Sequence, residues 1–116
     1  MENLKLSVDE AVVYLKENLK MHDRLEIAFN RIFAEGEVLN IDFSKYFDKP
    51  GFKILVSLDA DSINPTIEID VYEIKDDLIE YTIYPKNGKD TYVSVLNDWL
   101  KKRGSYFIFK IAIIIL

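Results

Sequence analysis

Apolar and polar residues alternate along the middle of the chain in three runs that are separated by two turn signals. The runs cover residues 52–59, 66–74 and 78–84, and the segments between them are Ala60 to Pro65 and Lys75 to Asp77. Asp, Asn, Ser and Pro favour bends, and alternation with a period of two is typical of a strand that buries one face. The pattern therefore predicts an antiparallel β-meander between Phe52 and Tyr84.

The register of this meander follows from the requirement that all apolar sets share one face, since a slip of one residue would turn a strand over. The pairs that meet it are Leu58 with Ile67, Val56 with Ile69, Ile54 with Val71, Val71 with Tyr81 and Ile69 with Ile83. The polar face then carries the five predicted partner-binding residues, which are Asp59, Glu68, Asp70, Tyr72 and Glu80. Lys53 is the single basic residue beside them. This face is either merely solvated or docks a basic partner.

Two helices are predicted before the meander. Ser7 to Glu10 matches a capping box, and the apolar spacing that follows predicts a helix over residues 8–20. A second helical stripe runs from Leu25 to Phe33, with Asp23 as its N-terminal cap and Gly36 as its stop. Residues 37–43 alternate again and predict an edge strand or first strand.

The C-terminal third offers two interpretations. Asn87-Gly88 could close a hairpin onto a strand over residues 91–95. Alternatively, Asp90 could cap a helix that ends at the basic residues 101–103 and Gly104. We favour the helix. Residues 106–116 are apolar apart from Lys110, which predicts a buried C-terminal strand.

The predicted fold class is therefore α+β in a single domain, residues 1–116. It consists of two N-terminal helices, an antiparallel meander of about four strands, one helix and a buried C-terminal strand.

Composition limits the classes of function. The net charge is −5, and the excess of acids lies in residues 36–90, which hold twelve acids and six bases. This charge argues against direct nucleic-acid binding by phosphate neutralisation. The chain has no cysteine, which fits a reducing, cytoplasmic location. No signal peptide is recognisable, and the apolar residues 106–116 fall short of the roughly 18 that a membrane span needs, so no membrane is expected.

One segment resembles an enzyme motif. Ile54 to Ile63, an apolar strand followed by Asp59-Ala60-Asp61, resembles the D-x-D segment of haloacid-dehalogenase-type phosphatases. The resemblance implies a metal-dependent phosphoesterase in which Asp59 and Asp61 bind Mg²⁺. Ile63 stands where that family usually has Thr or Val, and the family also requires a parallel sheet, a phosphate-binding Lys and a later acidic pair. An Asx turn after a strand explains the same residues.

Other chemistry has little support in the sequence. His22 is the only histidine, so no zinc site is expected, and no serine lies in a nucleophile elbow. The four glycines lie at predicted element ends and form no phosphate-binding loop. We therefore expect no catalytic residue, no metal and no cofactor.

The sequence predicts a small acidic protein-binding module, of an inhibitor or immunity type, that sequesters a basic, nucleic-acid-processing protein through its acidic sheet face. A dimeric binder similar to secretion chaperones and the phosphoesterase are the alternatives. A homodimer completed by residues 106–116 is a further possibility.

Overall fold

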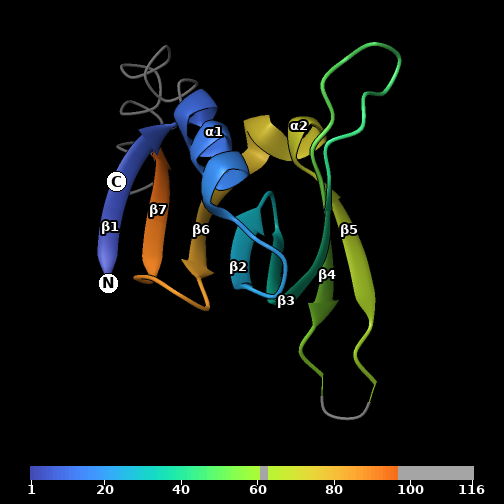
Figure 1. The fold of residues 1–116 in the computed structure, drawn as a ribbon. Coiled ribbons are helices and arrows are strands. Elements are labelled where there is room, and N and C mark those ends of the chain that lie inside the picture. The colour runs from blue at the N-terminus through green and yellow to red at the C-terminus, as the bar shows by residue number, and fades with distance from the viewer. Residues whose placement is uncertain (61–62, 97–116) are drawn as a thin grey trace, which may run out of the picture.

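The computed structural model describes residues 1–60 and 63–96, and two short α-helices lie there on one face of a mixed β-sheet (Figure 1). The strands are β1 (Glu2–Ser7), β2 (Arg24–Phe29), β3 (Ile32–Asp42), β4 (Lys53–Leu58), β5 (Thr66–Asp70), β6 (Leu78–Tyr84) and β7 (Thr91–Leu96). The helices are α1 (Val8–Asn18), α2 (Val71–Ile74) and the 3₁₀ turn η1 (Lys75–Asp77).

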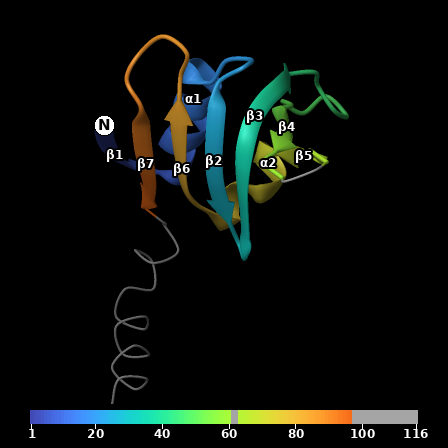
Figure 2. The same cartoon turned by 90° about the horizontal axis from the view of Figure 1, so that it is seen from below.

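The sheet has seven described strands in the order β1-β7-β6-β2-β3-β4-β5. β1 pairs with β7 in parallel, and the other neighbours are antiparallel. Among the described strands, β1 and β5 are therefore the two edges. Figure 2 shows α1 and α2 behind the same side of the central strands, so the core lies between this side and the helices.

The first predicted helix is confirmed as α1, and its start shows the capping box. The Ser7 hydroxyl accepts from the Glu10 amide at 3.2 Å, and the Glu10 carboxylate accepts from the Ser7 amide at 3.1 Å. Ala11 and Leu15 are fully buried against the sheet. The buried Tyr81 hydroxyl of β6 donates to the Ala11 carbonyl at 2.7 Å, which fixes the helix on the sheet.

The second predicted helix is wrong, because residues 24–42 form the β2–β3 hairpin. The apolar residues between Leu25 and Phe33 match a helical period, but Leu25, Ile27 and Phe29 also alternate, and these three are the buried ones. Asn30 takes φ 55° in the tight turn, a conformation that Asn tolerates.

Gly36 ends no helix. It lies within β3, opposite Leu58, where a Cβ atom would be 1.9 Å from the Ser57 carbonyl oxygen. The strand predicted over residues 37–43 is confirmed within β3, but it lies inside the sheet and not at an edge.

The predicted meander is confirmed only in part. β4 and β5 pair antiparallel as predicted, with Val56 opposite Ile67 and Ile54 opposite Ile69. This register differs from the predicted one by two residues, so the buried face is unchanged. The predicted pairing of residues 66–74 with 78–84 is wrong, because β6 pairs with β2 and β7.

The chain leaves the sheet at Asp70. This residue caps α2 by accepting from the Glu73 amide at 3.3 Å, and the Val71 that follows is fully buried. α2 and η1 then carry the chain past β4, β3 and β2 to β6. At the end of β5 the chain therefore enters a capped helix and does not turn back as a hairpin.

Residues 91–96 are strand β7 and not the start of a helix, so the Asn87-Gly88 hairpin was the better alternative. β7 lies between β6 and the N-terminal strand β1, which gives its backbone two sets of partners. The rest of the predicted helix and the predicted strand over residues 106–116 lie outside the described residues.

The predicted α+β class, with two N-terminal helices and a four-stranded meander, is therefore wrong for this sheet-dominated protein. None of the helices in the described part is long and apolar enough to cross a membrane.

Candidate functional site

In the described part of the chain, no helix covers the sheet face opposite α1. We call the outward side chains of the three central strands the open face. They are Glu80, Thr82 and Tyr84 of β6, Arg24, Glu26 and Ala28 of β2, and Phe33, Glu35 and Glu37 of β3. Four of these residues are carboxylates and one is a guanidinium. Glu26 lies directly opposite Glu35, so like charges are adjacent at the centre of the face.

Arg24 offsets part of this repulsion. Its two terminal nitrogens donate to the two Asp59 oxygens at 3.3 and 2.5 Å, and one of them also lies 3.3 Å from Glu35 Oε1. The guanidinium hydrogen bond lowers the pKa of the Asp59 carboxyl, and the same bond raises the pKa of Arg24. The side chains of Arg24, Glu35 and Asp59 are all about half exposed. Exposed ion pairs add little to stability, so this arrangement mainly fixes the positions of the three side chains on the surface.

Two tyrosines hold two further carboxylates in place. The Tyr84 hydroxyl donates to Glu26 Oε1 at 3.0 Å, and the Tyr92 hydroxyl, on the neighbouring strand β7, donates to Glu80. Desolvation and then the Glu26 hydrogen bond raise the pKa of Tyr84, whereas the Glu80 hydrogen bond is the main cause that raises the pKa of Tyr92. Both hydroxyls therefore stay protonated donors at neutral pH.

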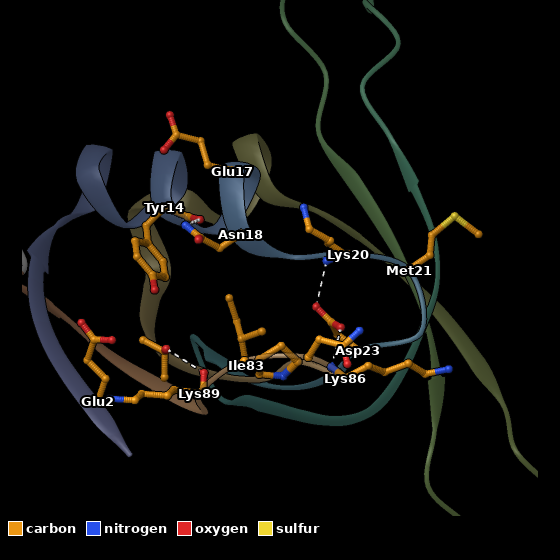
Figure 3. A pocket seen from close by; sticks show the side chains of 14 residues that line it. Glu2, Tyr14, Glu17, Asn18, Lys20, Met21, Asp23, Ile83, Lys86 and Lys89 are labelled. Atoms are coloured by element: carbon orange, nitrogen blue, oxygen red, sulfur yellow. Dashed lines mark hydrogen bonds between the residues drawn. The ribbon is translucent and has the colours of Figure 1, made fainter.

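A cleft of about 630 Å³ lies at another place, between the end of α1 and the β6–β7 turn (Figure 3). Tyr14 and Ile83 supply apolar surface, and Lys20, Lys86 and Lys89 line it together with Glu2 and Glu17. In Figure 3 the Tyr14 ring projects from α1 toward the cleft, while the Lys86 side chain points away from it. When Asp23 is counted, three acidic and three basic residues line the cleft, so their formal charges balance.

Asp23 forms the wall of this cleft and is 4% exposed. Its Oδ2 accepts from the Lys20 amide at 3.0 Å, and its Oδ1 accepts from the Lys86 amide at 3.2 Å. Asp23 was predicted to cap a helix, and it instead joins the loop after α1 to the β6–β7 turn. Because both oxygens bind backbone amides, we assign this carboxylate a structural role.

The five predicted site residues do not form one patch. Glu68 and Asp70 lie together on β5, and Glu80 is on β6, with β2, β3 and β4 between the two strands. Four strand spacings correspond to roughly 19 Å. Asp59 follows β4 and is bound by Arg24, and Tyr72 belongs to α2, where its ring lies 6.4 Å from that of Phe52. Whether any of them binds a partner stays a prediction.

The phosphatase resemblance does not extend to the fold. β4, which precedes Asp59, is antiparallel to both of its neighbours, whereas that family requires a parallel sheet. Asp61 lies outside the described residues. Within residues 1–60 and 63–96, no group of three or more His, Cys, Asp or Glu side chains could hold a metal ion.

Sequence reasoning missed the centre of the open face. Arg24, Glu26, Glu35 and Glu37 fell within or just after the wrongly predicted helix, so their common face could not be recognised. A signal was present, because Arg24 to Phe29 alternates strictly between polar or small and large apolar residues. His22 lies in the loop before β2 with φ 75°, and its Nδ1 is 3.1 Å from Glu37 Oε2.

Comparison with known proteins gives a family but no activity. No curated protein and no solved structure matches the chain. The model of one family, described as "Uncharacterized protein conserved in archaea (DUF2097)", matches residues 2–94. This range includes every described strand except the last two residues of β7. Because the match covers most of the sequence, the chain belongs to this family of archaeal proteins.

Proposed function

We propose that this protein is a binding module whose open face holds a basic protein partner. The observation that supports the proposal is the excess of carboxylates at the centre of the sheet, where Glu26, Glu35 and Glu37 accompany a single Arg24. Complementary charge speeds encounter and selects against acidic competitors.

The hydrogen bonds on this face also support the proposal. Each central carboxylate has a neighbour that fixes its direction: Tyr84 for Glu26, Arg24 for Glu35, and His22 for Glu37. Side chains that are already ordered lose less conformational entropy when a partner binds. The carboxylate oxygens that have no hydrogen-bond partner among the described residues are then available to Lys and Arg side chains of the partner.

The proposal does not include an inhibitor or immunity role. The family description indicates neither role. The face of the predicted meander, which motivated both roles, does not form, because β6 pairs with β2. A cytoplasmic location is part of the proposal, since a chain without cysteine fits a reducing compartment.

The test is a titration of ¹⁵N-labelled protein with acetylated and amidated decalysine at low and high salt. Amide shifts should concentrate on β6, β2 and β3 and should weaken as salt rises. The triple variant Glu26→Gln, Glu35→Gln, Glu37→Gln should weaken binding about tenfold, because it removes the central charges while Gln can still accept from Tyr84.

The matched control removes three exposed acids elsewhere, with Glu17→Gln, Asp76→Asn and Asp77→Asn. This control changes the net charge by the same amount. If it weakens decalysine binding as much as the open-face triple variant does, only the overall charge matters and the proposal is wrong.

A further inference from the structure

The β5 edge of the sheet has a groove along it. β5 is the last strand in the sheet order and pairs only with β4 among the described strands (Figure 1). A cavity of about 620 Å³ is lined both by Ile67 and Ile69, which face the core side, and by Glu68 and Asp70, which face the opposite side. Since alternate side chains point to opposite faces, a cavity that touches both sets reaches around the free edge of β5, and its contacts with Phe29 and Ile32 extend it along the core side of the sheet.

The backbone along this edge has groups that β4 does not use. Leu58 donates to the Pro65 carbonyl and Val71 donates to the Phe52 carbonyl, both at 2.8 Å. In an antiparallel pair, hydrogen-bonded and non-hydrogen-bonded residues alternate. Ile67 and Ile69 therefore bond to β4, and the N–H and C=O groups of Thr66 and Glu68 point away from it.

The two sides of the groove differ in chemistry. The partly buried Ile67 and Ile74 and the half-exposed Ile32 supply apolar surface on the core side, and Ile69 is buried behind them in the core. Glu68, Asp70 and Glu73 supply carboxylates, and Lys53, whose Nζ is 4.0 Å from Glu68, is the cation among the residues that line the groove. A strand placed here would need apolar residues facing one side and basic residues facing the other.

We propose that the basic partner contributes an extended segment, with alternating apolar and basic residues, that adds a strand to β5. Main-chain hydrogen bonds to Thr66 and Glu68 supply affinity, and the two linings of the groove select the side chains. The added strand continues the sheet, so its basic side chains extend over the same side as the open face. This inference rests on the proposed function in that it takes the partner to be basic.

The probe is the acetylated and amidated octapeptide (Lys-Val)₄, with (Glu-Val)₄ as the charge control, and the assay is the same amide titration. We expect (Lys-Val)₄ to shift the amides of β5 and α2, and we expect (Glu-Val)₄ not to bind. Two versions of (Lys-Val)₄, one N-methylated at every Lys and one at every Val, each lose the N–H groups on one edge of the peptide strand. The version that loses the edge facing β5 should bind at least about tenfold more weakly to the unchanged protein, and the other version should bind as (Lys-Val)₄ does.

The protein variants compare Glu68→Pro with Glu68→Ala. Both remove the carboxylate, but only proline removes the N–H at the free edge, and a strand tolerates proline where the N–H faces outward. We expect Glu68→Ala to lose about threefold and Glu68→Pro at least about tenfold in affinity. Far-UV circular dichroism and thermal unfolding of each variant confirm that the sheet is retained.

Three results would overturn strand addition: equal losses for the two variants, no effect of N-methylation, or a wild-type dimer that Glu68→Pro abolishes, since a second copy would then occupy the edge. None of these tests changes a residue of the open face. The triple variant at Glu26, Glu35 and Glu37 tests that face separately. If that variant abolishes decalysine binding while Glu68→Pro leaves (Lys-Val)₄ binding unchanged, the proposed function stands and this inference fails.

Discussion

Replacement of Asp23 tests whether a single buried carboxylate joins the two loops beside the cleft. Its two oxygens accept from different amides, those of Lys20 and Lys86. Asparagine has only one acceptor oxygen, so Asp23→Asn can keep one of these bonds and must point an amide donor at the other N–H. Asp23→Ala removes both acceptors and leaves both amides without a protein partner.

The size of the effect follows from the type of bond. A hydrogen bond to a charged group contributes about 1.5–3 kcal/mol. We therefore expect Asp23→Asn to lower the free energy of unfolding by about 1.5–3 kcal/mol. We expect Asp23→Ala to lower it by about 3–5 kcal/mol, because neighbouring bonds do not add fully.

Urea unfolding followed by circular dichroism measures these values. With a slope of about 2 kcal/mol per molar urea, Asp23→Ala should shift the midpoint by about 1.5–2.5 M. Glu17→Ala, an exposed position that lines the same cleft, is the control and should change stability by less than about 0.5 kcal/mol. A loss below about 1 kcal/mol for Asp23→Ala would refute the structural role of this carboxylate.

Two further predictions follow from other contacts. Gly36→Ala should destabilise by about 3 kcal/mol or more in urea unfolding, because the new Cβ would lie 1.9 Å from the Ser57 carbonyl oxygen and a backbone atom cannot move aside easily. Asn40→Ala, exposed on the same strand, is the control, and a similar small effect at both positions would contradict the close approach. Burial raises the pKa of Tyr81, as it does that of Tyr84, and hydrogen bonding to Glu80 raises that of Tyr92. A raised pKa means that the folded state favours the protonated hydroxyl. The stabilisation from these three tyrosines is therefore present below the unfolded pKa of about 10 and is lost as pH rises through the folded pKa values. Tyrosinate absorbance should show that these three tyrosines ionise above pH 10, and Glu80→Gln should lower the pH at which Tyr92 ionises. Ionisation of all three at the ordinary pKa of tyrosine would contradict the geometry.

Signals that act over three or four residues were enough to predict two local elements. The Ser7–Glu10 capping box gave α1, and both of its hydrogen bonds are present. The alternation on both sides of Pro65 gave the β4–β5 pairing, although the register was off by two residues. A shift of two keeps the same residues buried, so burial alone could not distinguish the two registers.

Where a segment allowed two interpretations, long-range strand pairing selected one of them. Residues 25–33 match both a helix and a hairpin, and the hairpin prevails because β3 and β6 give β2 hydrogen-bond partners on both sides. β7 is a strand because the N-terminal β1 lies parallel beside it. The open face depends on the same long-range pairings. Its carboxylates come from strands that the sequence alone could not bring together, since backbone groups in a sheet are satisfied by segments far away along the chain.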